Sequence, residues 1–112
     1  MNTESLDKKL VGTVEQNEHT YTVYLVNGDY VKGKWEMDFV DAGNYKRFFG
    51  FIPEGEIWLD KHVDKSEHPY NLYHEIHECE LMREGLSYSE SHFRANGTEH
   101  FLRRFFPNKK RG

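Results

Sequence analysis

The sequence has little cysteine and no long apolar run, and each shortage excludes a class of protein. Its 112 residues include one cysteine, Cys79. A single cysteine cannot form an intrachain disulfide, which excludes a disulfide-stabilised scaffold and favours a reducing, cytoplasmic setting. The apolar runs are only a few residues long, so no membrane-spanning helix is predicted. The polar start, MNTESLDKKL, does not resemble a signal peptide.

Basic charge is scarce over most of the chain. The sequence carries 15 basic and 19 acidic residues, a net charge of −4. Five of the basic residues lie in the last twelve, FLRRFFPNKKRG, so residues 1–100 hold 10 basic against 19 acidic residues. Such an acidic body argues against binding along a phosphate backbone. Nucleic-acid binding is therefore not expected, apart from weak contact through a basic tail at 103–111.

The first half of the chain shows the alternation of β-strands. From Thr20, apolar and polar residues alternate in TYTVYLV, and a similar run, YVKGKW, follows Asn-Gly at 27–28. β-Branched and aromatic residues on both sides of Asn-Gly predict a β-hairpin. Further strands are predicted at 48–52 and 56–60, so residues 19–60 are expected to form a small antiparallel sheet.

The second half carries the start and stop signals of two helices. Pro69 suits the first turn of a helix, where its missing N–H would have no partner. Gly85 suits the position just after a helix end. Ser87 and Glu90 have the spacing of a capping box that begins a second helix, which is predicted to end within residues 94–105.

Strands followed by helices predict an α+β fold. The expected layout is one domain over residues 1–112, with a small N-terminal antiparallel sheet at 19–60 and two packed C-terminal helices at 69–105. Residues 1–18 are expected to be disordered, and residues 106–112 form the end of the basic tail.

The stretch HEIHE at 74–78 lies in the first predicted helix and differs by one position from the zinc-protease pattern H-E-x-x-H. Residues four apart share a helix face, so His74 pairs with Glu78 rather than with His77. At about 100° per residue, His77 falls at the border of a polar, solvent-facing side. The other residues on that side are Tyr73, Glu80 and Glu84. H-E-x-x-E keeps the ligand geometry, with His74 and Glu78 as candidate metal ligands and Glu75 in the position of the general base.

A metal centre of this kind needs a third protein ligand, which the second helix offers. Catalytic zinc usually has three protein ligands and one open position. His92 and Glu99 fall on the apolar face of the second helix, so His92 is predicted to be the third ligand. Glu99 is predicted to be a fourth oxygen ligand or the acceptor of a hydrogen bond from a ligating imidazole. His77 is kept as a further candidate for that supporting role.

Each candidate also has an ordinary structural explanation. A lone His74 is more often a hydrogen-bonded core residue, a lone Glu78 could pair with Arg83, and a lone His92 could pack beneath the sheet. Several polar groups that converge on facing surfaces need partners, which favours a site for Zn²⁺ or another divalent metal. Cys79 lies on the apolar stripe and is expected in the core. The remaining histidines, His19, His62, His68 and His100, are expected at the surface.

Between Val23 and Glu99 the chain resembles a group of small bacterial and phage-type proteins with a zincin-like, metallopeptidase-like helix. The matching stretches are FIPEGEIWLD at 51–60, LYHEIHE at 72–78 and LMREGLSYSESH at 81–92, with Asn96 and Glu99 beyond them. The resemblance implies a minimal zincin-like architecture, in which a strand along the cleft at 56–60 precedes the ligand helix and a further helix supplies the last ligand.

The resemblance also implies roles for single residues. His74 would be the first ligand, and Glu75 would activate water. Glu78 stands where the usual pattern has a second histidine, and an anionic ligand makes a metal a weaker Lewis acid.

Two classes of function remain open. A metal-dependent, peptidase-like hydrolase would bind metal through His74, Glu78 and His92, with Glu75 as general base and an extended peptide or protein substrate along strand 56–60. Alternatively, the cluster is a structural metal site or a metal-free hydrogen-bonded network. The chain would then be a non-catalytic binding or regulatory protein of phage or mobile-element type.

Overall fold

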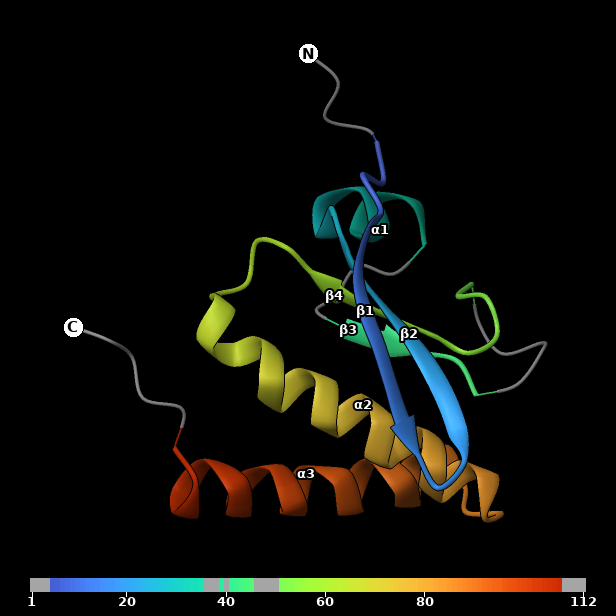
Figure 1. Cartoon of the computed structure of the whole chain (residues 1–112), viewed down its shortest axis with the longest axis vertical. Coiled ribbons are helices and arrows are strands. Elements are labelled where there is room, and N and C mark those ends of the chain that lie inside the picture. Colours follow the sequence, from blue (N-terminus) through green and yellow to red (C-terminus); the bar gives the residue numbers. More distant parts are fainter. Residues whose placement is uncertain (1–4, 36–38, 40, 46–50, 108–112) are drawn as a thin grey trace.

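The structure is a computed structural model that describes residues 5–35, 39, 41–45 and 51–107. It confirms an α+β fold, in which a four-stranded sheet comes first and a pair of packed helices follows (Figure 1). Within the described residues, no helix combines the length and the apolar character needed to cross a membrane.

The sheet is mixed rather than antiparallel. The strands are β1 (Lys9–Gln16), β2 (His19–Val26), β3 (Asp41–Gly43) and β4 (Glu56–Asp60); the helices are α1 (Gly28–Lys34), the 3₁₀ turn η1 (Lys65–Glu67), α2 (His68–Arg83) and α3 (Tyr88–Phe105). The strand order is β1-β2-β4-β3. The outer pairs are antiparallel, but β2 and β4 run parallel, which corrects the prediction. A parallel pair requires a crossover connection, and the long segment between β2 and β4, which contains α1, provides it.

The predicted hairpin around Asn27-Gly28 is wrong, because this dipeptide begins α1. The Asn27 side chain caps the helix by accepting a hydrogen bond from the Asp29 N–H at 3.1 Å. Gly28 is required for a different reason: a Cβ there would lie 2.1 Å from the Asp60 carboxylate. The Gly28 N–H instead donates to Asp60 Oδ1 at 3.0 Å. This contact ties α1 to the end of β4.

The N-terminal segment expected to be disordered contains a strand. β1 pairs with β2 through a turn at Asn17 and Glu18, whose φ values are 51° and 69°. Positive φ at both central residues is characteristic of the type I′ turn of two-residue hairpins. Leu10 and Val11 are 62% and 58% exposed. Because this edge strand buries little on either face, it lacks the alternation by which strands are recognised.

The strand predicted at 48–52 falls largely outside the described residues, which resume at 51. Residues 51 and 52 themselves form a turn and a bend. The strand predicted at 56–60 is confirmed as β4.

The helical pair is confirmed together with the predicted residues at the helix ends. Pro69 lies in the first turn of α2, and Gly85 follows its end with a φ of 103°. The Ser87 hydroxyl caps α3 by accepting from the Glu90 N–H at 3.1 Å. α3 continues through Gly97 to Phe105 without a break.

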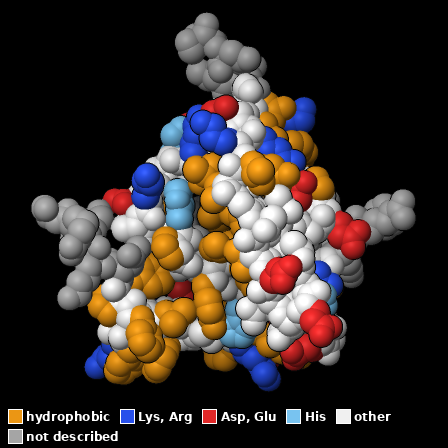
Figure 2. Space-filling view, in the orientation of Figure 1, with side chains coloured by type: hydrophobic (Ala, Val, Ile, Leu, Met, Phe, Trp, Pro, Cys, Tyr) orange, Lys and Arg blue, Asp and Glu red, His pale blue; other side chains and the backbone are white. Residues whose placement is uncertain are grey.

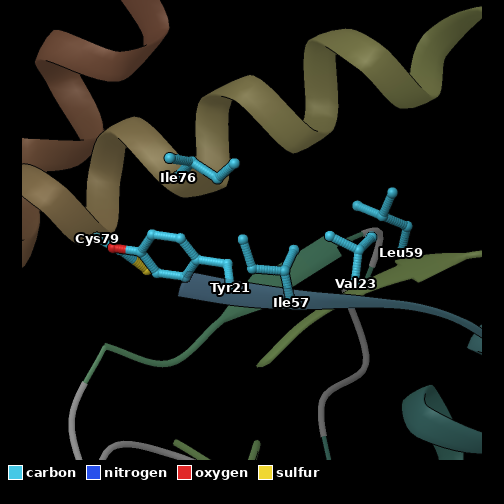
Figure 3. Close-up of a cluster of buried hydrophobic side chains, with 6 residues drawn as sticks. All are labelled: Tyr21, Val23, Ile57, Leu59, Ile76 and Cys79. Carbon is cyan, nitrogen blue, oxygen red and sulfur yellow. The ribbon is translucent and has the colours of Figure 1, made fainter. Parts of the chain in front are cut away.

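α2 lies between the sheet and α3 (Figure 1). Its sheet-facing side contributes to a core of Tyr21, Val23, Ile57, Leu59, Ile76 and Cys79 (Figure 3). Cys79 is only 1% exposed, as predicted for a core residue. α2 also passes close to β3, where a Cβ on Gly43 would lie 3.3 Å from the Cys79 sulfur. The opposite side of α2 is left to meet α3, and the candidate site lies there.

Candidate metal centre

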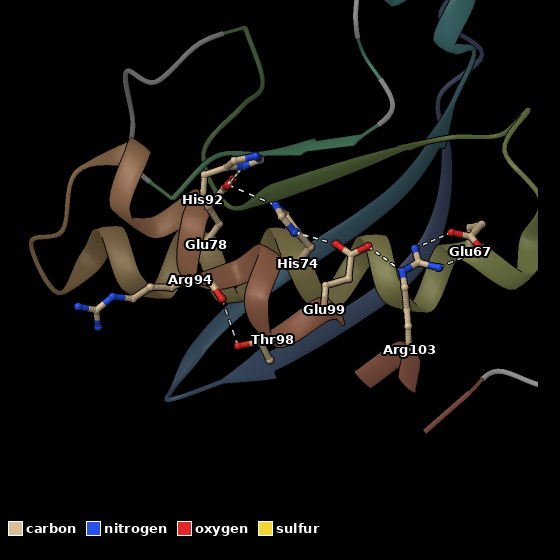
Figure 4. A network of polar contacts seen from close by, with 8 residues as sticks. All are labelled: Glu67, His74, Glu78, His92, Arg94, Thr98, Glu99 and Arg103. Carbon is tan, nitrogen blue, oxygen red and sulfur yellow. Dashed lines mark hydrogen bonds and ion pairs between the residues drawn. The ribbon is translucent and has the colours of Figure 1, made fainter. Parts of the chain in front are cut away.

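Polar side chains occupy the face of α2 that meets α3. His74 and Glu78, one turn apart, are 6% and 4% exposed. The two helices approach closely because α3 presents the small, fully buried Ser91 and Ala95 to this interface. The larger His92 of α3 reaches across to the same site (Figure 4).

The three predicted metal ligands converge. Glu78 Oε2 lies 2.7 Å from His92 Nδ1 and 3.4 Å from His74 Nε2. One ligand atom from each residue lies within 4.8 Å of the others, so the group could hold a metal ion. Ligand atoms at about 2.0–2.1 Å from a tetrahedral zinc ion stand about 3.3 Å from one another. The Glu78–His74 distance matches this spacing, and the Glu78–His92 distance is shorter by the margin of a direct hydrogen bond.

The cluster is closed on one side and open on the other. The side chains of His74 and Glu78 are 8% and 5% exposed, whereas that of His92 is 45% exposed. Tyr88 stacks on the His92 ring at a centroid distance of 5.5 Å. Three protein donors with one accessible side are typical of catalytic zinc, since structural zinc usually has four protein ligands.

Glu99 lies where a supporting acceptor is needed. Its Oε1 is 2.9 Å from His74 Nδ1, which favours the hydrogen-bond acceptor over the fourth ligand. An acceptor at Nδ1 leaves Nε2 directed at Glu78 and free to bind a cation. Burial lowers the pKa of His74, but the hydrogen bond and charge of Glu78, with the charges of Asp41 and Glu99, outweigh this effect and raise it above its usual value. The surroundings of His74 thus favour positive charge.

Glu75, predicted to activate water, is 7% exposed and is hydrogen-bonded to Asp41 of β3. Burial raises the pKa of the Glu75 carboxyl well above its usual range, and Asp41 raises it further. Burial also raises the pKa of Asp41. Two carboxyls in contact, one buried and one half-buried, are stabilised when they share a proton. Glu75 is therefore one half of an acid pair beside the cluster.

Asp41 is a partner that sequence reasoning misses. DAGN at 41–44 has the composition of a turn or irregular loop. In the sheet, Asp41 stands opposite Leu59, whose side chain belongs to the core beneath α2. Residues paired across strands share a face, so Asp41 also faces α2. Only the pairing of β3 with β4 reveals this position.

His77 is not part of the group of converging ligand atoms. It is half-buried in a groove of about 270 Å³ between β1 and α2, beside Val14 and Ile76. Its ring stands edge-on to Tyr73, and its Nδ1 is buried with no hydrogen-bond partner in the described part of the chain. Burial, followed by the charge of His74, lowers the pKa of His77. The expectation that this side of α2 faces solvent is therefore wrong at His77.

Glu80, expected on the same solvent-facing side, is buried with 7% exposure. The β1–β2 hairpin covers it. Asn17 Nδ2 and His19 Nδ1 lie 3.1 Å and 2.9 Å from its oxygens, and the Tyr21 hydroxyl donates to it. Burial raises the pKa of Glu80, but these hydrogen bonds hold it below its usual range. His19, expected at the surface, is half-buried in this contact.

The basic residues predicted to form a weak nucleic-acid contact at 103–111 are only partly within the described residues. Arg103 and Arg104 belong to α3, and residues 108–112 lie outside the described residues. Arg103 points toward Glu99 and pairs with it. Hydrophobic side chains gather over this end of α3, at the lower left of Figure 2. Those most exposed are Phe101, Phe105 and Phe106.

Comparison of the chain with models of known protein families, with curated proteins and with solved structures gives no match. The chemistry of the cluster therefore has to be judged from its own residues.

Proposed function

We propose that the chain is a metal-dependent hydrolase of the peptidase-like class, with Zn²⁺ or another divalent ion held by His74, Glu78 and His92. The convergence of two imidazoles and one carboxylate at a site open on one side carries this proposal. The same donor set, two histidines and one glutamate, serves catalytic zinc in known metallopeptidases.

A divalent ion bound there would polarise a substrate carbonyl and lower the pKa of water. The residues of the chain would hold and orient the reactants. Glu99 fixes the His74 ring, and Glu75 takes the proton from the attacking water. The hydrogen bond to Asp41 would hold the Glu75 carboxyl in place for this step.

The open side of the cluster is where substrate would approach. Tyr88, whose ring stacks on His92, is 52% exposed and offers apolar surface beside the proposed metal site. A peptide or protein substrate with an apolar side chain near the reactive carbonyl fits this surface. Strand 56–60 does not take the role expected of it. β4 pairs with β2 on one side and with β3 on the other, which leaves no free edge for an added strand.

One observation favours the alternative, a non-catalytic binding or regulatory protein. Glu75 is 7% exposed and already engaged with Asp41, so a water molecule has little access to it. In this alternative, His74, Glu78 and His92 form a structural metal site or a hydrogen-bonded network, and the protein acts by binding a partner protein.

Metal content and hydrolysis together test the proposal. We expect purified protein to hold about one divalent ion per chain by elemental analysis, and His92→Ala to lose it. His100→Ala is the matched control, because His100 is an exposed histidine on the same helix outside the cluster. Glu75→Gln should keep the metal and lose hydrolysis of unstructured peptides.

The outcomes separate the candidates. Metal that persists in His92→Ala contradicts the role of His92 as a ligand, and hydrolysis that persists in Glu75→Gln contradicts the role of Glu75 as general base. Bound metal without hydrolysis in the native protein favours the binding protein. If the native protein takes up no metal, the cluster is neither a catalytic nor a structural metal site, and the hydrogen-bonded network is the explanation that stays.

A further inference from the structure

A chain of ion pairs leads from the metal cluster to the start of α2 (Figure 4). Glu99 Oε1 lies 2.9 Å from His74 Nδ1, and Arg103 Nε donates to Glu99 Oε2 at 2.9 Å. The other two guanidinium nitrogens of Arg103 donate to both oxygens of Glu67, at 2.6 Å and 3.2 Å. Glu67 belongs to η1, directly before α2. One arginine thus joins the two helices that supply the ligands.

We propose that Arg103 is a positioning residue for the metal centre. Anchored by Glu67, it fixes the Glu99 carboxylate, which in turn holds the His74 ring with Nε2 directed at Glu78. This inference rests on the proposed metal binding, and it adds two residues, Arg103 and Glu67, that lie outside the group of converging ligand atoms.

The geometry explains why an arginine stands at this position. A guanidinium presents donors in a planar fork, so one side chain can hold two carboxylates at fixed angles. The ammonium of a lysine is a point charge on a flexible stem and fixes neither. The Arg103 guanidinium also lies over the ring of Tyr70, 4.4 Å from its centroid. Arg103 is therefore held by Glu67, Glu99 and Tyr70 at once.

Without this anchor, Glu99 would be poorly fixed. Its side chain is 20% exposed, so water can compete for its oxygens. A carboxylate with several rotamers would hold the His74 ring in several orientations, and only one of them directs Nε2 at Glu78. The residues that accept hydrogen bonds from metal-ligating histidines typically change metal affinity by about 10- to 100-fold when they are lost. Arg103 acts one contact further out, so the lower end of that range is expected.

The same helix contains a matched control. Arg94 Nε donates to Glu90 Oε2 at 2.8 Å, which is the same four-residue spacing and the same pair of atoms as in the Arg103–Glu99 contact. Both partners are about half exposed, and neither contacts the cluster. If Arg103 only stabilised α3, replacing either arginine would change the stability of the protein and leave its zinc affinity unchanged.

The test compares Arg103→Gln, Arg103→Lys and Arg94→Gln with the native protein, with circular dichroism to confirm that each is folded. Zn²⁺ affinity is measured by competition with a chromophoric chelator. We expect Arg103→Gln to bind about 10-fold more weakly, Arg103→Lys to recover part of that loss, and Arg94→Gln to stay within about twofold of the native protein.

A second readout follows His74 in the metal-free protein. Long-range ¹H–¹⁵N spectra should show a hydrogen-bonded Nδ1–H of His74 in the native protein and in Arg94→Gln. In Arg103→Gln, the signal should be lost to exchange with solvent. Unchanged zinc affinity with an unchanged His74 signal in Arg103→Gln overturns the proposal, as does equal weakening in Arg94→Gln. If the native protein binds no metal, the proposed function fails, while the His74 signal still decides whether Arg103 positions that ring.

Discussion

Two buried glutamates of α2, Glu78 and Glu80, differ in what surrounds them. They are 4% and 7% exposed and stand two residues apart. Glu80 accepts hydrogen bonds from an amide, a phenol and an imidazole, all supplied by the β1–β2 hairpin. In the described residues, the contacts of Glu78 are with the imidazoles of His74 and His92.

The two sites differ in how many of the groups around the glutamate can bind a metal ion. Two of the three donors at the Glu80 site, the amide N–H and the phenol O–H, stay protonated at neutral pH and are poor metal ligands. That site therefore offers one imidazole, His19, beside its carboxylate, whereas the Glu78 site offers two. A neutral imidazole has a lone pair, so the two rings and the Glu78 carboxylate can all turn toward one metal ion. Burial alone therefore does not mark a functional carboxylate; the chemistry of its partners does.

The largest effect is expected for Glu78→Gln. The amide keeps the size of the side chain and can still hydrogen-bond the imidazoles, but it is a neutral and much poorer ligand. We predict that zinc affinity falls by about 100-fold or more, while the unfolding free energy of the metal-free protein changes by less than about 1 kcal/mol. Calorimetric titration and urea unfolding measure the two quantities. Zinc binding of native strength in this variant would remove Glu78 from the ligand set.

Glu80→Ala should show the opposite pattern. It leaves the Tyr21 hydroxyl, which is fully buried, without an acceptor and removes the polar contacts between the hairpin and Glu80 of α2. We predict that the unfolding free energy falls by about 2–3 kcal/mol, with zinc affinity within about threefold of native. Urea unfolding at neutral pH checks the first value. If zinc affinity dropped as far as in Glu78→Gln, the two sites would not be separate.

The pH dependence of stability sharpens the contrast at Glu80. The hydrogen bonds from Tyr21, Asn17 and His19 hold its pKa in the folded state below its usual value. A depressed carboxyl pKa contributes stability that is fully present above the unfolded pKa, about 4.3, and is lost as pH falls through the folded pKa. The stability advantage of the native protein over Glu80→Gln should thus be constant above about pH 5 and shrink at lower pH. An advantage that grows toward acid would contradict the lowered pKa.

The smallest effect is expected for His77→Ala. His77 lies outside the group of His74, Glu78 and His92, and its Nδ1 is buried without a hydrogen-bond partner in the described residues. Removing an unsatisfied polar atom offsets the loss of its packing, so the unfolding free energy should change by less than about 1 kcal/mol. Zinc affinity should stay within about twofold. A large loss of zinc binding, measured beside His92→Ala, would place His77 in the site.

The candidate metal ligands on the two facing helices could be predicted from sequence. Helix periodicity puts His74 and Glu78 on one face, and the same periodicity puts His92 and Glu99 on the facing side of the next helix. Helix signals are local, so the caps at Ser87 and Gly85 are also visible in the sequence. These residues define the two surfaces that meet, and their convergence follows from a short connection between two helices.

The strand at 56–60 could be predicted from its local pattern, but the errors on the sheet side could not be avoided, because each depends on a contact between residues distant in sequence. Periodicity alone puts Glu80 toward solvent, since nothing local shows that the β1–β2 hairpin covers it. Asn27-Gly28 has the composition of a hairpin turn, and only the Asp60 carboxylate, 32 residues away, explains the glycine. Asp41 joins Glu75 only because β3 pairs with β4.

The most direct test of the metal centre is X-ray absorption spectroscopy of the zinc-loaded protein. We predict two imidazole nitrogens and one carboxylate oxygen at about 2.0–2.1 Å from zinc, with any further ligand a light atom and no sulfur. A sulfur ligand at about 2.3 Å, which only Cys79 or a methionine could supply, or fewer than two imidazoles, would contradict a site formed by His74, Glu78 and His92.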